Sequence, residues 1–121
     1  MEEYAEKVIV TNNKKVQEKY SDVGYQVLFL PEVSLVYMTA RDLIHKNFFL
    51  VNHSMTANIP IYKHPYRSLA LKLGKSLHHD SLMLIERALE KLRMGTMPNY
   101  PEQVLQDFQD LDLTLFQEVK L

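Results

Sequence analysis

Short runs of β-branched and aromatic residues alternate along this chain with segments of helical periodicity. Helical segments at 14–20 and 34–46 separate the first three runs, and strands joined by helices of this length imply parallel pairing through right-handed crossovers. The pattern therefore predicts an α/β fold, a small three-layer sandwich with a mostly parallel four-stranded sheet of the Rossmann or flavodoxin type. The predicted strands cover residues 8–10, 25–30, 48–52 and 68–73.

The second half of the chain predicts one long loop and two further helices. Residues 53–67 have no clear period, and loops of this length in compact domains are usually functional or mobile. Asp80 is placed to cap a helix that Gly95 ends. From Pro101 onward, apolar residues at spacings of three and four predict a C-terminal amphipathic helix over 101–121, although leucines at every second position leave a strand open.

The length and composition fit a single domain, which we expect to span residues 1–121. A chain of this length buries roughly 65% of the surface that its unfolded form exposes, which is enough for one core. Hydrophobic residues make up 46% of the sequence, and this argues against intrinsic disorder. The expected core lies at strand centres and on apolar helix faces and comprises Val8, Ile9, Val10, Val27, Leu28, Phe29, Leu43, Phe49, Leu50, Val51, Leu69, Leu71, Ile85 and Leu89.

Charge and apolarity argue against several classes of protein. The net charge of -1 gives no general attraction to nucleic acid or to an anionic membrane. No segment has the length and apolarity of a membrane span, and the acidic N-terminus lacks a signal-peptide core. We therefore expect a cytoplasmic protein. The absence of cysteine excludes disulfides, thiolate metal sites and a thiol nucleophile.

The sequence predicts neither a metal site nor a cofactor. His78 and His79 are adjacent, so on an extended chain they point to opposite sides, and a solvated turn before a helix explains them better than a metal. The same applies to His64, which has no histidine at ligand spacing. Three glycines cannot build a dinucleotide fingerprint or a phosphate-binding loop. Carboxylates do not cluster at strand ends, and we expect those at 107, 110 and 112 to form the solvated face of the C-terminal helix.

Two of the predicted strands end in polar clusters. In an open parallel sheet, ligands bind beyond the carboxyl ends of the strands, and a 2-1-3 strand order would make these clusters neighbours. Hydroxyls, amides and an imidazole beside a helix N-terminus suit a small carboxylate or other anionic ligand. Capping of helices and turns explains the same residue types, so both interpretations stay open. The candidate ligand-binding residues are Thr11, Asn12, Asn13, Asn52, His53, Ser54, Asn58, Tyr66 and Ser68.

The loop over 53–67 is the element that we expect to carry function. It begins at the carboxyl end of a strand, so it should pack beside Thr11-Asn12-Asn13 and form one wall of the crevice. We expect His53 to face the crevice and the Tyr66 ring to pack against the domain. There the imidazole could act as an acid, a base or a hydrogen-bond donor. The alternative is a histidine whose ring is satisfied by the loop backbone.

Four short stretches, in their order and spacing, resemble the GrdX family, small proteins associated with glycine, sarcosine and betaine reductase systems of anaerobic amino-acid-fermenting bacteria. They are the first strand with Thr11-Asn12-Asn13, the stretch RDLIHK at 41–46, the hydrophobic strand into His53, and PYRS at 65–68. The resemblance covers roughly residues 8–92. The resemblance implies an accessory or regulatory protein of such a reductase system, with reductase-system proteins or a small ligand as partners. It supplies no catalytic residues.

This chain departs from the family pattern after the loop histidine. Ser54, Ala57 and Pro60 stand where the family is expected to carry Pro, Gly and Lys, which puts an activity of the loop in doubt. The alternative function is a small enzyme or ligand-binding domain that acts on a carboxylate-bearing metabolite through His53 and the Asn-rich strand ends. The missing cofactor motifs and the missing carboxylate cluster favour the non-catalytic accessory role.

Overall fold

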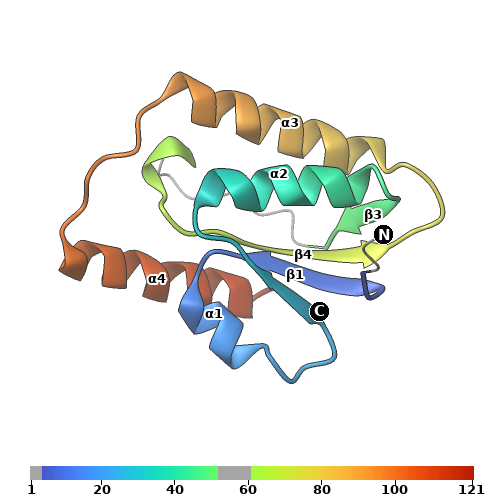
Figure 1. Ribbon diagram of the computed structural model, residues 1–121, viewed down its shortest axis with the longest axis horizontal. Helices are drawn as coiled ribbons and strands as arrows, with labels where there is room; N and C mark the ends of the chain where they lie inside the picture. Colours follow the sequence, from blue (N-terminus) through green and yellow to red (C-terminus); the bar gives the residue numbers. More distant parts are fainter. Residues whose placement is uncertain (1–3, 52–60) are drawn as a thin grey trace.

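The computed structural model describes residues 4–51 and 61–121 (Figure 1). Its strands are β1 (Lys7–Thr11), β2 (Gln26–Phe29), β3 (Phe48–Leu50) and β4 (Ser68–Leu73). Its helices are α1 (Lys14–Lys19), α2 (Val33–Ile44), α3 (His79–Met94) and α4 (Glu102–Gln117), with a short 3-10 helix, η1 (Ile61–Lys63), before β4. None of the described helices is long and apolar enough to cross a membrane.

The sheet is mixed, with the strand order β2-β1-β4-β3. β1 and β2 are parallel, whereas β4 is antiparallel to both β1 and β3. The expected mostly parallel sheet of Rossmann or flavodoxin type is therefore wrong. A parallel return after β3 needs a long crossover, usually a helix, and the described part of this connection carries only the three-residue η1. β4 instead runs back antiparallel and pairs with β1 and β3.

The position of β4 between β1 and β3 also contradicts the expected 2-1-3 strand order. β1 and β3 both run antiparallel to β4, so their carboxyl ends lie at the same edge of the sheet, but β4 separates them. The neighbour of the β1 carboxyl end is the start of β4, where Thr11 lies opposite Ser68. The polar groups beside Thr11-Asn12-Asn13 therefore include those of the segment that leads into β4, rather than those at the end of β3.

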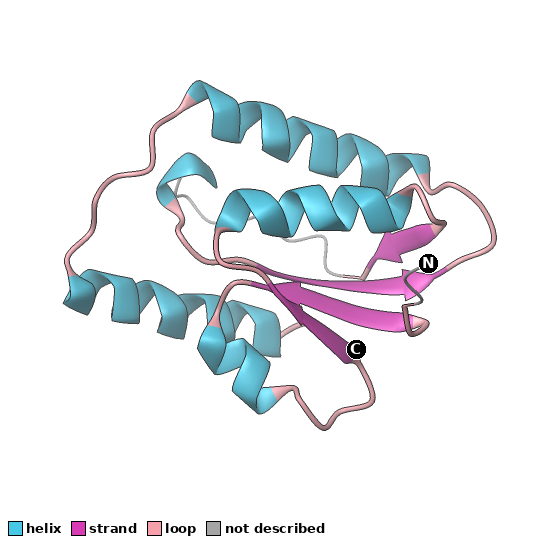
Figure 2. Cartoon of the chain, in the orientation of Figure 1, coloured by secondary structure: helices cyan, strands magenta, loops and turns pink. Residues whose placement is uncertain are grey.

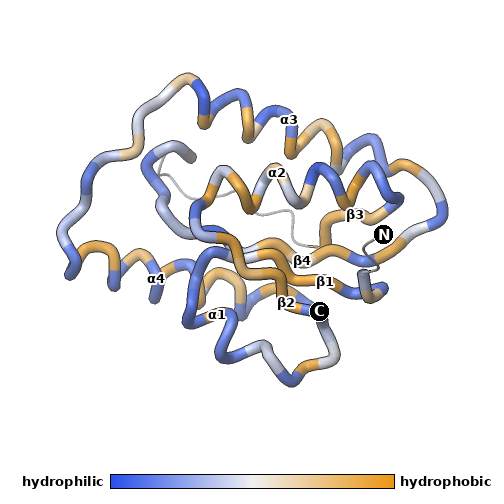
Figure 3. Tube along the Cα trace, viewed as in Figure 1, coloured by the Kyte–Doolittle hydropathy of each residue, from blue (hydrophilic) through white to orange (hydrophobic). Residues whose placement is uncertain are grey.

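Helices cover both faces of the sheet, α2 and α3 on one side and α1 and α4 on the other (Figure 2). Because strand side chains alternate, Val8 and Val10 of β1 join the core under α2 and α3. Ile9 between them joins a second core with Val16 and Phe116 on the opposite face. Hydrophobic residues accordingly concentrate along β1 and β4 in Figure 3.

Nine of the fourteen expected core residues are buried, and the other five lie on the edge strands or directly beside them. Phe29 of β2 is 37% exposed, and Val27, Leu28, Phe49 and Val51 are partly buried. Strands at the edge of a sheet have a neighbour on one side only, which leaves their side chains less covered. The expected core residues that are buried are Val8, Ile9, Val10, Leu43, Leu50, Leu69, Leu71, Ile85 and Leu89.

Several helix ends follow local side-chain chemistry. Asn13 caps α1, because its side chain accepts a hydrogen bond from the Lys15 N–H. The expected cap of α3 at Asp80 is wrong: His78 takes that position and accepts from the Ser81 N–H at 3.2 Å. Gly95 ends α3 as predicted. α4 occupies the segment for which the sequence left both helix and strand open.

Candidate functional site

A buried chain of hydroxyls joins the end of β1 to the start of β4. The Thr11 and Ser68 hydroxyl oxygens lie 2.7 Å apart, and the Ser68 hydroxyl donates to Asp112 Oδ2 at 2.7 Å. Because a hydroxyl has one proton, Thr11 is the donor to Ser68. Thr11 Oγ1 also accepts from the Asn13 N–H at 3.0 Å. Both hydroxyls are therefore occupied by protein partners.

Asn13 connects this chain of hydroxyls to two helices. Its Oδ1 caps α1, while its Nδ2 donates to Asp112 Oδ2 at 3.0 Å and to the Gln109 carbonyl at 2.9 Å. Asn13 is fully buried and Asp112 is 2% exposed. Burial raises the pKa of the Asp112 carboxyl, while the hydrogen bonds from Asn13 and Ser68 and the charge of Arg67 oppose that rise.

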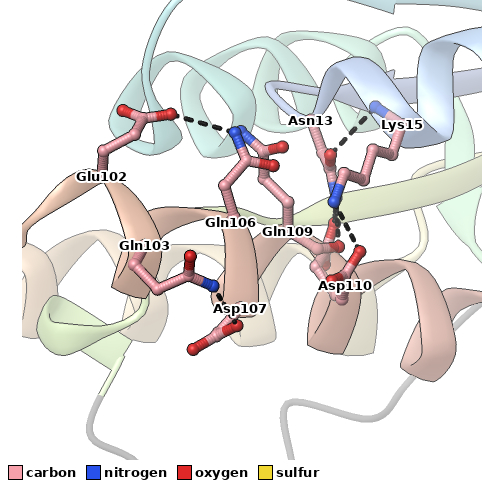
Figure 4. A network of polar contacts seen from close by, with 9 residues as sticks. Asn13, Lys15, Glu102, Gln103, Gln106, Asp107, Gln109 and Asp110 are labelled. Atoms are coloured by element: carbon pink, nitrogen blue, oxygen red, sulfur yellow. Dashed lines mark hydrogen bonds and ion pairs between the residues drawn. The ribbon is translucent and has the colours of Figure 1, made fainter.

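The contact between α1 and α4 continues from this buried network to the surface. Figure 4 shows Lys15 of α1, two residues after the buried Asn13, reaching Asp110 of α4. Along α4, Gln106 donates to Glu102, and Gln103 donates to Asp107. These outer pairs are exposed, so they contribute little to stability compared with the buried carboxylate.

Asn12 holds the segment before β4 with both ends of its amide. Its Nδ2 donates to the Pro65 carbonyl at 2.8 Å, and its Oδ1 accepts from the Arg67 N–H at 2.9 Å. Asn12 is 6% exposed. Tyr66, which stands between the two bonded residues, is thereby fixed in place relative to the end of β1.

Arg67, Tyr37 of α2 and His64 are further buried polar residues. The Arg67 side chain donates to the Tyr37 hydroxyl, and burial raises the pKa of Tyr37 to about 12. Arg67 Nε has no hydrogen-bond partner among the described residues. Burial, assisted by the Arg67 charge, lowers the pKa of the fully buried His64 to about 4, against a smaller opposing effect of the Tyr66 backbone. His64 is therefore neutral at pH 7, and its ring lies 5.4 Å from that of Phe108.

A pocket of about 320 Å³ opens beside Asn12, at the start of α2. The chain after β2, the N-terminal turn of α2, η1 and the end of α3 all contribute to its wall. Its lining includes Asn12, Glu32, Val33, Tyr62, Tyr66 and Met97. In the described residues, no three His, Asp or Glu side chains lie together as ligands for a metal ion.

The structure brings five of the predicted site residues together at the carboxyl end of β1 and the start of β4. Thr11, Asn13 and Ser68 share the buried network, whereas Asn12 and Tyr66 line the pocket. The loop was predicted to contact Thr11-Asn12-Asn13. In the described end of the loop, Pro65 and Arg67 make this contact through their hydrogen bonds with Asn12. Four predicted residues lie outside the described part of the chain, so their role stays a prediction: Asn52, His53, Ser54 and Asn58.

The sequence interpretation missed the buried ionisable residues. Asp112 was expected on a solvated helix face and is instead the acceptor at the centre of the network. Its spacing could have shown this, because it follows Phe108 by four residues and precedes Phe116 by four, which places all three on one face of the helix. Arg67 and His64 had no comparable signal, since they lie in a segment without periodicity.

The chain matches the GrdX-like protein family over residues 8–120. This match extends beyond residues 8–92, over which the sequence resembles the family, and includes α4 with Asp112. No curated protein and no solved structure matches the sequence. The family match covers nearly the whole chain, and the protein therefore belongs to the GrdX-like family.

Proposed function

We propose that this protein is a non-catalytic accessory or regulatory protein of an amino-acid reductase system of the glycine, sarcosine and betaine kind. The name of its family supports that setting. The observation that supports a non-catalytic role is the closed hydrogen-bond network at the carboxyl end of β1. There, the hydroxyls and the carboxylate that could serve a reaction are buried and bonded to one another.

A nucleophilic mechanism needs a hydroxyl that a base activates and that a substrate can reach. Ser68 is 4% exposed and gives its proton to Asp112, while its oxygen accepts from Thr11. His64 is a poor base, since its pKa is lowered to about 4. The network is suited to fixing α1, α4 and the sheet relative to one another, which preserves a surface for a partner.

The alternative, an enzyme or ligand-binding domain for a carboxylate-bearing metabolite, rests mainly on His53, which lies outside the described residues. Of the other residues on which this alternative relies, Thr11 and Asn13 are described in the structure, and both are hydrogen-bonded within the buried network. The accessory role therefore has more support from the geometry.

The test is a titration of the purified protein against each purified component of a glycine, sarcosine or betaine reductase. We expect saturable binding to at least one component and an altered rate of the complete reductase. The protein alone should not consume glycine, sarcosine or betaine. Turnover by the isolated protein, or no binding to any component together with no effect on the rate, would contradict the proposal.

A further inference from the structure

The pocket beside Asn12 has a distinctive charge pattern. Of the described residues that line it, Glu32 is the only one with a charged side chain, and the others are mainly aromatic, aliphatic or proline residues. Its volume of about 320 Å³ is at the small end of the range for metabolite sites. The pocket therefore offers one exposed carboxylate beside a largely apolar wall.

The Glu32 carboxylate is not engaged elsewhere in the described structure. Glu32 occupies the N-cap position of α2, where a side chain commonly accepts a hydrogen bond from the first turn. Its side chain makes no such bond, and it forms no ion pair with a described residue. Its charge is available to a ligand in the pocket.

The position of Tyr62 depends on a glycine. A Cβ atom at Gly95 would lie 2.2 Å from Cγ of the Tyr62 ring, so any other residue there would displace the ring. Gly95 has an ordinary extended backbone with φ at -118°, which other residues adopt freely. The close approach of the ring is thus what requires glycine. The Tyr100 hydroxyl, donating to the Lys63 carbonyl at 2.8 Å, fixes the next residue.

Tyr66, the second tyrosine of the pocket, is fixed by the Asn12 amide. The bonds from Asn12 to Pro65 and Arg67 hold the backbone on both sides of Tyr66. The backbone that carries Tyr66 and the ring of Tyr62 are therefore held in place before any ligand arrives, which lowers the conformational cost of binding.

We propose that this pocket binds a small organic ammonium ion with apolar substituents, recognised by Tyr62, Tyr66 and the Glu32 carboxylate. Tyrosine rings attract cations through their faces, and this attraction increases when the cation is poorly hydrated. The carboxylate adds charge complementarity, and the apolar wall accommodates alkyl groups. The inference goes beyond the accessory role and does not depend on it.

The decisive comparison uses choline and 3,3-dimethylbutan-1-ol, which have the same shape and differ in the charge of the central atom. Binding to the full chain is measured by calorimetry and by the ring-proton resonances of tyrosine, at constant ionic strength. We expect saturable choline binding on the order of millimolar, and binding of the neutral alcohol at least about tenfold weaker. Acetate serves as the anionic probe and should not bind.

Variants assign the binding to the pocket. Tyr62→Leu should weaken choline binding about tenfold, while Tyr62→Phe, which keeps the ring, should change it little. Glu32→Gln should weaken it several-fold, whereas Glu90→Gln, an exposed carboxylate of α3, should not. Gly95→Ala should act like the loss of the Tyr62 ring, with the neighbouring Thr96→Ala as its control. Melting curves establish that each variant is folded, and Glu32→Gln remains informative if Gly95→Ala does not fold.

Three results would overturn the proposal. One is the absence of saturable choline binding up to about 100 mM, a concentration at which a site of this class would be filled. Another is equal binding of the neutral alcohol, which would make the pocket merely apolar, or preferential binding of acetate. The third is choline binding that is unchanged in both Tyr62→Leu and Glu32→Gln.

Discussion

Asp112 is the only acidic side chain among the described residues that is buried, and two hydrogen-bond donors meet at one of its oxygens. Ser68 comes from the sheet and Asn13 from the start of α1, while Asp112 itself belongs to α4. Buried polar networks stabilise a fold only when all their members are satisfied. The contribution of Asp112 should therefore become visible when one of its oxygens is replaced.

Asp112→Asn should destabilise the protein by about 1–3 kcal/mol, because the neutral amide loses the charge that strengthens the hydrogen bonds from Ser68 and Asn13 and keeps only one acceptor oxygen. Urea unfolding measures this free energy. Asp110→Asn is the matched control, since Asp110 lies one-half turn away on the surface and pairs only with Lys15 among the described residues. Equal stability of the two variants would show that the Asp112 contacts are dispensable.

His64 should make the stability of the protein depend on pH. Burial lowers its pKa from 6.5 to about 4, so between these values the unfolded chain binds the proton that the folded chain rejects. The destabilisation caused by His64 is therefore absent above pH 6.5 and grows as the pH decreases towards 4, to about 3 kcal/mol. Asp112, whose pKa is raised, acts in the opposite direction: its contribution decreases as the pH rises above its unfolded value.

Unfolding by urea at pH values from 4 to 7 tests the histidine directly. His64→Gln should reduce the loss of stability between pH 6.5 and pH 4, and substitution of the exposed His45 by Gln serves as the matched control. A profile that keeps its slope in His64→Gln would assign the pH dependence to another group.

Among the helices, α1 shows how a six-residue element is stabilised by its surroundings. Helices this short are marginal alone, so α1 depends on its cap and on packing. Asn13 supplies the cap and at the same time donates to Asp112 and Gln109 of α4. Val16 is the buried residue of α1 and packs in the core that contains Phe116.

Two substitutions at Asn13 separate these roles. Asn13→Ser can still cap α1 but loses the bonds to α4, whereas Asn13→Ala loses both. We expect unfolding free energies that decrease from wild type to Ser to Ala, with the Ser-to-Ala step about 1 kcal/mol. Urea unfolding measures the series. If the Ser and Ala variants were equally destabilised, the cap would contribute nothing, and the hydrogen bonds to α4 would account for the whole loss of unfolding free energy.

The elements could be located from the sequence because hydrophobic periodicity and helix-ending residues are local signals. Asn13 and Gly95, for example, mark helix ends through their own chemistry. The direction of β4 was not accessible in this way, since its alternating residues would look the same in a parallel or an antiparallel pair. Likewise, pocket residues such as Glu32 and Tyr62 come together only through the fold. Asp112 was accessible in principle through its spacing to Phe108 and Phe116.

In the whole molecule, the mixed sheet separates two cores of unequal size. The larger lies under α2 and α3, while the smaller contains Ile9, Val16, Ala70 and Phe116 and lies under α1 and α4. The Phe116 ring meets that of Tyr20 edge-on, with centroids 5.1 Å apart. The C-terminal helix is thus a component of the second core.

Removal of residues 101–121 should abolish cooperative folding. It would expose Ile9 and Ala70 to water and leave Asn13 and Ser68 without the Asp112 carboxylate. The combined loss exceeds what a domain with a typical stability of about 5–15 kcal/mol tolerates. Thermal unfolding followed by near-ultraviolet circular dichroism provides the measurement.

Phe116→Ala is the graded version of this truncation and should cost about 3–5 kcal/mol, because it empties the centre of the second core while retaining Asp112. A matched substitution is Leu111→Ala, since Leu111 lies on the same helix but is 37% exposed and should cost far less. If α4 were an appendage, the truncated chain would unfold cooperatively at the wild-type temperature, and Phe116→Ala would resemble Leu111→Ala. A much larger loss of unfolding free energy in Phe116→Ala than in Leu111→Ala, together with loss of cooperativity on truncation, would establish that the sheet needs helices on both faces to fold.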